Sequence, residues 1–150
     1  MNLTPVLAIR LVHLIAVALA VGAATAKNLL LYRCRKDPSF VPTYLKVEGP
    51  ITKQIVVGQA LLTLTGIVYA LLLGYGFTLR LIVKVVLLAI LWVLGPAIDN
   101  VVGPRFKKTA PAPGEPVTQE FIQALNRYLF WDVVASGIFY AIIILWVVMS

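Results

Sequence analysis

Long apolar runs separated by polar connectors dominate the sequence. Four of these runs contain few charged residues and have about the length, roughly 20 residues, that a helix needs to cross the hydrocarbon core of a bilayer. They cover residues 5–26, 54–78, 79–98 and 128–149. The pattern therefore predicts an all-α, polytopic membrane protein, with residues 1–150 forming a single domain that folds as a four-transmembrane-helix bundle.

Two long connectors, residues 27–53 and 99–127, separate these runs, whereas a tight turn at Gly74-Tyr75-Gly76 joins the second run to the third. The second connector is rich in proline and is expected to be an extended loop. It ends in the stretch from Val117 to Phe121, which predicts a helix N-cap followed by an acidic first turn. Both connectors are too polar to form domains of their own.

The composition supports a membrane location. The chain is 61% hydrophobic and only 13% charged, whereas soluble domains are about half apolar and a quarter charged. Its one cysteine, Cys34, excludes an intramolecular disulfide and a cysteine-based metal cluster. Cys34 follows Arg33 in a basic run, so we expect a thiol on the cytoplasmic surface.

The charge balance predicts the orientation in the membrane. The 13 basic and 6 acidic residues give a net charge of +7. Ten of the 13 basic residues lie in the two connectors: Lys27, Arg33, Arg35, Lys36, Lys46, Lys53, Arg105, Lys107, Lys108 and Arg127. By the positive-inside rule, both connectors are cytoplasmic loops and both termini lie outside. We therefore expect a multi-pass protein of a bacterial-type inner (cell) membrane, with lipid rather than nucleic acid around it.

Small residues mark a face on which helices are expected to approach closely. Ala16, Ala20 and Ala24 recur every four residues in the first run, and Gly58 lies in the second. Such positions allow close packing in lipid, where the hydrophobic effect does not drive helices together. The pattern predicts a packing seam.

Four nitrogen-bearing side chains fall inside the runs and need an explanation, because ionisable groups are costly in a membrane. Arg10 and His13 share one face of the first run, and Arg80 and Lys84 share one face of the third. Both runs cross in the same direction, so the four groups are expected to form a cationic pocket in the outer half of the bundle. No acidic side chain belongs to that half.

An external anion would balance this pocket, and a haem propionate, a lipid phosphate or an anionic substrate would each fit. The alternative is structural. Arg10 and Arg80 would then extend to the outer headgroups, while His13 forms a hydrogen bond with a neighbouring helix.

Two acids lie near the inner ends of the runs. Asp132 is expected either to pair locally with Arg127 or to be favoured by the start of its helix, with a proton relay as the alternative. Asp99 follows Gly95-Pro96, where a kink or a helix exit is expected.

Parts of the first and third runs resemble a known family. The stretch from His13 to Gly22 has a histidine nine residues before a glycine on an apolar helix. It resembles the first span of the HemJ-type protoporphyrinogen oxidases and of the related copper-resistance D (CopD) family. The stretch from Ile82 to Leu88, in which Lys84 opens an aliphatic run, resembles their third span.

The resemblance implies a haem-containing membrane enzyme that oxidises protoporphyrinogen IX, with His13 as the ligand of haem b and Lys84 as a second required residue. The sequence departs from those oxidases at Ile82, where they usually have a histidine, and at Val21, where they usually have a tryptophan. With a single histidine, the sixth coordination position would be empty, filled by another group or supplied by a second protomer.

Three functional hypotheses follow. The first is a haem-associated protein of this type, and as an enzyme it would be a haem-dependent oxidoreductase. The second is a non-catalytic accessory subunit of a larger respiratory, photosynthetic or oxidase complex, or a homo-oligomer, whose pocket holds lipid or a partner's cofactor. The third is a small carrier or copper-handling protein, which the near absence of outward-facing His and Met disfavours.

Overall fold

The computed structural model describes residues 3–73, 78–112 and 114–148, and this part of the chain is almost entirely helical. The elements are α1 (Leu3–Lys36), the short 3-10 helix η1 (Pro38–Phe40), α2 (Val41–Leu73), α3 (Leu79–Ala97), the π-helical turn η2 (Ile98–Val102), α4 (Gly103–Thr109) and α5 (Gln119–Val148). No strand occurs among the described residues, and the all-α prediction is confirmed.

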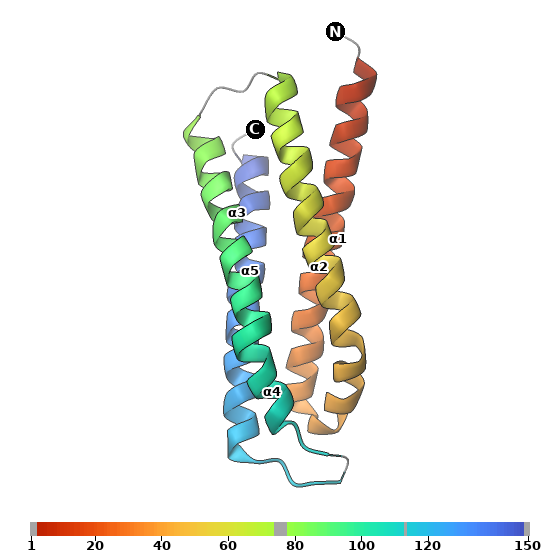
Figure 1. Cartoon of the computed structure of the whole chain (residues 1–150), viewed down its shortest axis with the longest axis vertical. Coiled ribbons are helices and arrows are strands. Elements are labelled where there is room, and N and C mark those ends of the chain that lie inside the picture. Colours follow the sequence, from red (N-terminus) through yellow and green to blue (C-terminus); the bar gives the residue numbers. More distant parts are fainter. Residues whose placement is uncertain (1–2, 74–77, 113, 149–150) are drawn as a thin grey trace.

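Four helical segments are long and apolar enough to cross a membrane, which confirms the predicted number of spans. They run side by side along the long axis of the molecule (Figure 1). The start of α1 and the end of α5 lie at one end of the bundle, and α4 lies at the other, which we call the connector end (Figure 1). The cytoplasmic location of the connector end remains a prediction from the charge pattern.

The helices extend well beyond the predicted spans, so the description of residues 27–53 as a loop is wrong. α1 continues to Lys36 and α2 begins at Val41, which leaves only Asp37 and η1 between them. In the second connector, 99–109 and 119–127 are helical, whereas 110–112 and 114–118 are not helical and agree with the predicted extended loop. Hydropathy ends a span where charged residues begin, but a helix can continue past that point when its charged side chains reach water or find partners. The predicted turn at 74–76 lies outside the described residues.

The ends of the helices follow local rules. The Asp37 carboxylate accepts a hydrogen bond from the Ser39 backbone N–H at 3.1 Å and starts η1. The Thr118 hydroxyl accepts one from the Phe121 N–H at 3.2 Å, which confirms the predicted N-cap of α5. Pro96 lies inside α3, and the chain continues through η2 into α4 instead of leaving the bundle.

α1 and α2 pack along the predicted seam of small residues. Ala16, Ala20 and Ala24 are buried, and Gly58 of α2 lies directly against the backbone of Ala20. A Cβ atom added at Gly58 would lie 2.6 Å from the Ala20 backbone nitrogen. This approach leaves no room for a side chain at Gly58, as in other small-residue contacts between membrane helices.

The other two long helices pack one after the other: α5 lies against α1, and α3 lies against α5. α3 makes few backbone contacts with α2, and a hydrogen bond from Trp92 Nε1 to Thr63 Oγ1 at 3.1 Å connects the two. At the connector end an aromatic core forms around Phe106, whose ring centroid lies 5.3 Å from that of Tyr128. Cys34 is buried in this core, so the prediction of a surface thiol is wrong.

We expect Gly58→Ala to destabilise the bundle by about 1–3 kcal/mol, because the new methyl group must push α1 and α2 apart. The matched control is Gly22→Ala, since a Cβ atom at Gly22 meets nothing within 4 Å. Thermal unfolding of the detergent-solubilised proteins measures both effects. Equal unfolding temperatures for the two variants would contradict the close approach.

Candidate functional site: a buried ionic network beside a cavity

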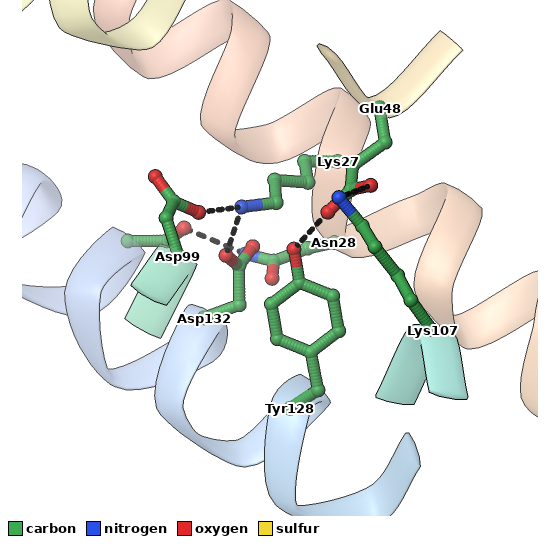
Figure 2. A network of polar contacts seen from close by, with 8 residues as sticks. Lys27, Asn28, Glu48, Asp99, Lys107, Tyr128 and Asp132 are labelled. Atoms are coloured by element: carbon green, nitrogen blue, oxygen red, sulfur yellow. Dashed lines mark hydrogen bonds and ion pairs between the residues drawn. The ribbon is translucent and has the colours of Figure 1, made fainter. Parts of the chain in front are cut away.

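The Lys27 side chain is the centre of the most buried charged cluster that the structure describes. Its ammonium lies 3.0 Å from Asp132 Oδ1 of α5 and 3.4 Å from Asp99 Oδ1 of η2 (Figure 2). The Lys27 side chain is 3% exposed and that of Asp132 is 7% exposed. Lys27 is therefore an interior residue and not a loop charge, and Asp132 pairs with Lys27 rather than with Arg127.

A second pair of contacts continues this cluster. The Tyr128 hydroxyl donates a hydrogen bond to Glu48 Oε1 at 2.7 Å, and the Lys107 ammonium lies 2.7 Å from Glu48 Oε2 (Figure 2). The Lys27 ammonium also lies 5.1 Å from the centroid of the Tyr128 ring, which suits a cation–π contact. The ionic network, as we call Lys27, Glu48, Asp99, Lys107 and Asp132, thus joins α1, α2, η2, α4 and α5.

The ionic network contains three carboxylates and two ammonium groups, so one negative charge is left over when all are ionised. Asp99 carries the weakest attachment, a single contact at 3.4 Å, and its side chain is 31% exposed. Asp132 and Glu48 each have a contact of 3.0 Å or less and are almost fully buried. The excess negative charge is therefore best assigned to Asp99.

A cavity of about 330 Å³ lies next to the ionic network and is bounded by α1, α2, α3, η2 and α5. Lys27, Asp99 and Asp132 form part of its wall. Gln59 of α2 lines it as well, and its buried Nε2 has no hydrogen-bond partner among the described residues. The volume falls in the range of small-molecule sites, about 300–1,000 Å³.

Asn28 and Ser136 extend the polar surface on the α1–α5 side. The Asn28 side-chain nitrogen donates to Ser136 Oγ at 2.7 Å, and Ser136 lines the cavity. The other amide atom of Asn28, Oδ1, is buried without a partner in the described part of the chain. Buried polar atoms are rarely left unpaired, and of these two amides only Gln59 lines the cavity, where its unpaired Nε2 distinguishes the wall from ordinary packing.

His13 lies in the other half of the bundle, where it contacts α2. Its Nδ1 is 2.7 Å from Thr65 Oγ1, and the Thr65 hydroxyl donates to the Leu61 carbonyl oxygen at 2.6 Å. Because a hydroxyl has only one proton, the hydrogen on this contact comes from Nδ1. In the neutral imidazole this assignment leaves the lone pair on Nε2, which is the form of histidine that binds a metal.

The four residues of the predicted cationic pocket come together only in part. Lys84 of α3 is near enough to His13 for its charge to act on the imidazole, and Arg80 acts on Lys84 in the same way. Lys84 is partly buried, whereas Arg10 and Arg80 are exposed on the surfaces of α1 and α3. His13 and Lys84 are therefore the less exposed members of this group, and the two arginines lie on the surface.

The side chains that are available as metal ligands limit the cofactors that this chain could hold. Among residues 3–73, 78–112 and 114–148, no group of three or more His, Cys, Asp or Glu side chains could hold a metal ion. A metal bound only by side chains would lack ligands here. A tetrapyrrole brings four nitrogen ligands of its own, so one imidazole is enough.

No protein-family model, curated protein or solved structure matches this chain. The resemblance to the HemJ and CopD proteins rests on the residues around His13 and Lys84 and stays a prediction.

We expect Lys27→Met to destabilise the protein by about 3–5 kcal/mol, because it leaves Asp132 buried without a partner. Lys36→Met is the matched control. Lys36 lies on the exposed last turn of α1, so its loss should cost less than about 1 kcal/mol. Adding Asp132→Leu to Lys27→Met should recover most of the stability, because the buried carboxylate is then removed as well. Unfolding free energies in mixed micelles test these values, and equal effects of the two single variants would contradict the buried pair.

Proposed function

We propose that this chain is an integral membrane protein that binds haem b, or a related tetrapyrrole, in the half of the bundle that contains His13 and Lys84. The observation that carries the proposal is the hydrogen bond between His13 Nδ1 and the Thr65 hydroxyl at 2.7 Å. Histidines that bind metals usually donate their second ring N–H to an oxygen in this way, because the contact fixes the tautomer and the ring orientation.

The distribution of charge supports an anionic ligand in this half. All six acidic residues of the chain belong to the connector end or its flanking helix turns: Asp37, Glu48, Asp99, Glu115, Glu120 and Asp132. Lys84 has no hydrogen bond or ion pair with any described residue. A tetrapyrrole propionate would supply the missing negative charge, and Arg10 and Arg80 lie where they can attract it. A lipid phosphate could use the same groups.

A haem bound here would supply redox chemistry, and the chain would bind and orient it. His13 would offer Nε2 to the iron of a bound haem, Thr65 would hold the imidazole through the observed hydrogen bond, and Lys84 would offer an ammonium to an acidic group of the ligand. By its resemblance to HemJ, the enzyme would be an oxidoreductase of the protoporphyrinogen oxidase type with Lys84 as the catalytic residue. Its place would be a bacterial-type inner membrane.

The protein purified from cells supplied with a haem precursor should show a Soret absorption band, and His13→Ala should abolish it because the axial ligand is lost. Thr65→Val keeps the imidazole but removes its hydrogen-bond partner, so we expect a weaker haem affinity, by about 10–100-fold. Absorption spectra normalised to protein concentration measure both effects. Haem-free protein that purifies only together with other subunits would contradict the proposal and favour an accessory subunit.

Lys84→Leu should fold normally and lose most of the bound ligand, because leucine keeps the apolar stem but removes the charge. Lys46→Leu is the matched control, since Lys46 is exposed near the connector end. The haem-to-protein ratio and the unfolding temperature, measured on the same samples, separate ligand loss from misfolding. Unchanged ligand content in a folded Lys84→Leu protein would contradict the proposed role of Lys84 in ligand binding.

A further inference from the structure

We infer that the cavity beside the ionic network binds a small organic cation that also carries a hydrogen-bond acceptor. This site lies at the connector end, more than two helical turns along α1 from His13, and does not depend on the proposed haem site. The inference rests on the charge of the wall, on an unpaired amide and on the chemistry of the remaining surface.

The net charge of the cavity wall indicates which charge a ligand would carry. Lys27 is shared by Asp132 and Asp99, and the two carboxylates outnumber the one ammonium on the cavity wall. Asp99 is the carboxylate with spare hydrogen-bonding capacity, since its contact with Lys27 is 3.4 Å long. A monovalent cation beside Asp99 would neutralise this part of the protein, where an uncompensated charge is costly.

The unpaired amide of Gln59 indicates that the ligand carries a hydrogen-bond acceptor. Gln59 is 6% exposed, lines the cavity and has a buried Nε2 with no partner among the described residues. A buried donor without an acceptor costs about 1–3 kcal/mol. A ligand with a hydroxyl or carbonyl oxygen would satisfy Gln59, and Ser136 on the opposite helix could contact the same group.

The rest of the wall favours an organic cation over a metal ion. Trp92 and Phe139 contribute aromatic rings, and Ile55, Val56 and Leu91 contribute aliphatic surface. No group of three metal-ligating side chains exists in the part of the chain that the structure describes. A cation with an apolar body would place its charge at Asp99 and its carbon atoms against these side chains, and a tryptophan face attracts such ions. The volume of about 330 Å³ accommodates a molecule of this kind.

Equilibrium dialysis of the full-length protein in detergent micelles tests the inference with two pairs of probes. Tyramine and choline are cations that carry a hydroxyl group. Their neutral counterparts, 4-propylphenol and 3,3-dimethylbutan-1-ol, have nearly the same shape without the charge. We expect saturable binding of at least one cation, roughly tenfold or more tighter than that of its neutral counterpart. Absence of saturable binding for both cations, or equal binding of each cation and its counterpart, would overturn the inference.

Variants locate the binding. Asp99→Asn should weaken cation binding by roughly tenfold or more, and Gln59→Leu should weaken it less because it removes only the amide. Glu120→Gln is the matched control, since it removes the same charge from an exposed position at the start of α5. Equal affinities of Asp99→Asn and Glu120→Gln would contradict the site.

A second variant keeps the test valid if Asp99→Asn fails to fold. Gly95 lines the cavity, and a Cβ atom added there meets nothing within 4 Å. Gly95→Leu should therefore fold and block cation binding without changing any charge. His13→Ala should leave cation binding unchanged, so the haem proposal and the cation site can fail independently of each other.

Discussion

The pairing of the Lys27 ammonium is the interaction on which the arrangement of the helices depends. Lipid and apolar side chains offer nothing that compensates a charge, so Lys27 must meet the carboxylates of Asp132 and Asp99 whenever the bundle is formed. α3 has few contacts with α1 and α2, so close packing alone does little to fix its position relative to them. The contact from Lys27 to Asp99 adds a constraint through η2, which continues directly from α3, and the hydrogen bond from Trp92 to Thr63 adds a second one. The apolar surfaces allow the helices to associate, and the ionic contacts select one arrangement.

The two ends of the bundle interior differ in the sign of their unbalanced charge. At the connector end, acidic groups exceed basic ones inside the bundle, although most basic residues of the chain lie on its surface there. The other half contains His13 and Lys84, and all six acidic residues of the chain lie toward the connector end. A bundle of this kind presents two chemically opposite environments to small molecules, separated along α1 by the tightly packed seam of Ala16, Ala20 and Gly58.

The sequence predicts the features that depend on local patterns. Four spans follow from apolar length, the seam follows from the four-residue spacing of alanines, and the Thr118 cap follows from its neighbours. The ionic network could not be predicted in this way, because Lys27 and Asp132 come from opposite ends of the chain and meet only after folding. The positive-inside rule explained Lys27 as one of many connector charges, so the charge pattern offered no reason to look for its carboxylate partners. Lys27 lies directly after the first apolar run, and Asp132 lies about one helical turn inside the last one. Two opposite charges at matching depths in the membrane are the sequence signal that could have identified this ion pair. Burial of Cys34 was missed for the same reason, since its basic neighbours Arg33 and Arg35 are exposed while the helix turns Cys34 inward.

The π turn η2 has a consequence for how chains of this type can vary in length. Leu91 and Ile98 are buried and seven residues apart, which places them on one face of an α-helix, but the next buried residue, Gly103, follows after five. In a regular α-helix a spacing of five residues would rotate Gly103 by about 140° from that face. The spacing of five residues from Ile98 to Gly103 equals one regular turn of four residues plus one inserted residue. The wider π turn η2 accommodates the extra residue, so that Gly103 and Phe106 again face the interior. A homologue that lacked one residue between positions 99 and 102 would form a regular α-helix there and keep both Asp99 and the aromatic packing of α4. Chains of this type can therefore differ by one residue at η2 without losing either contact, whereas a change of length elsewhere in α3 would rotate Asp99 away from Lys27.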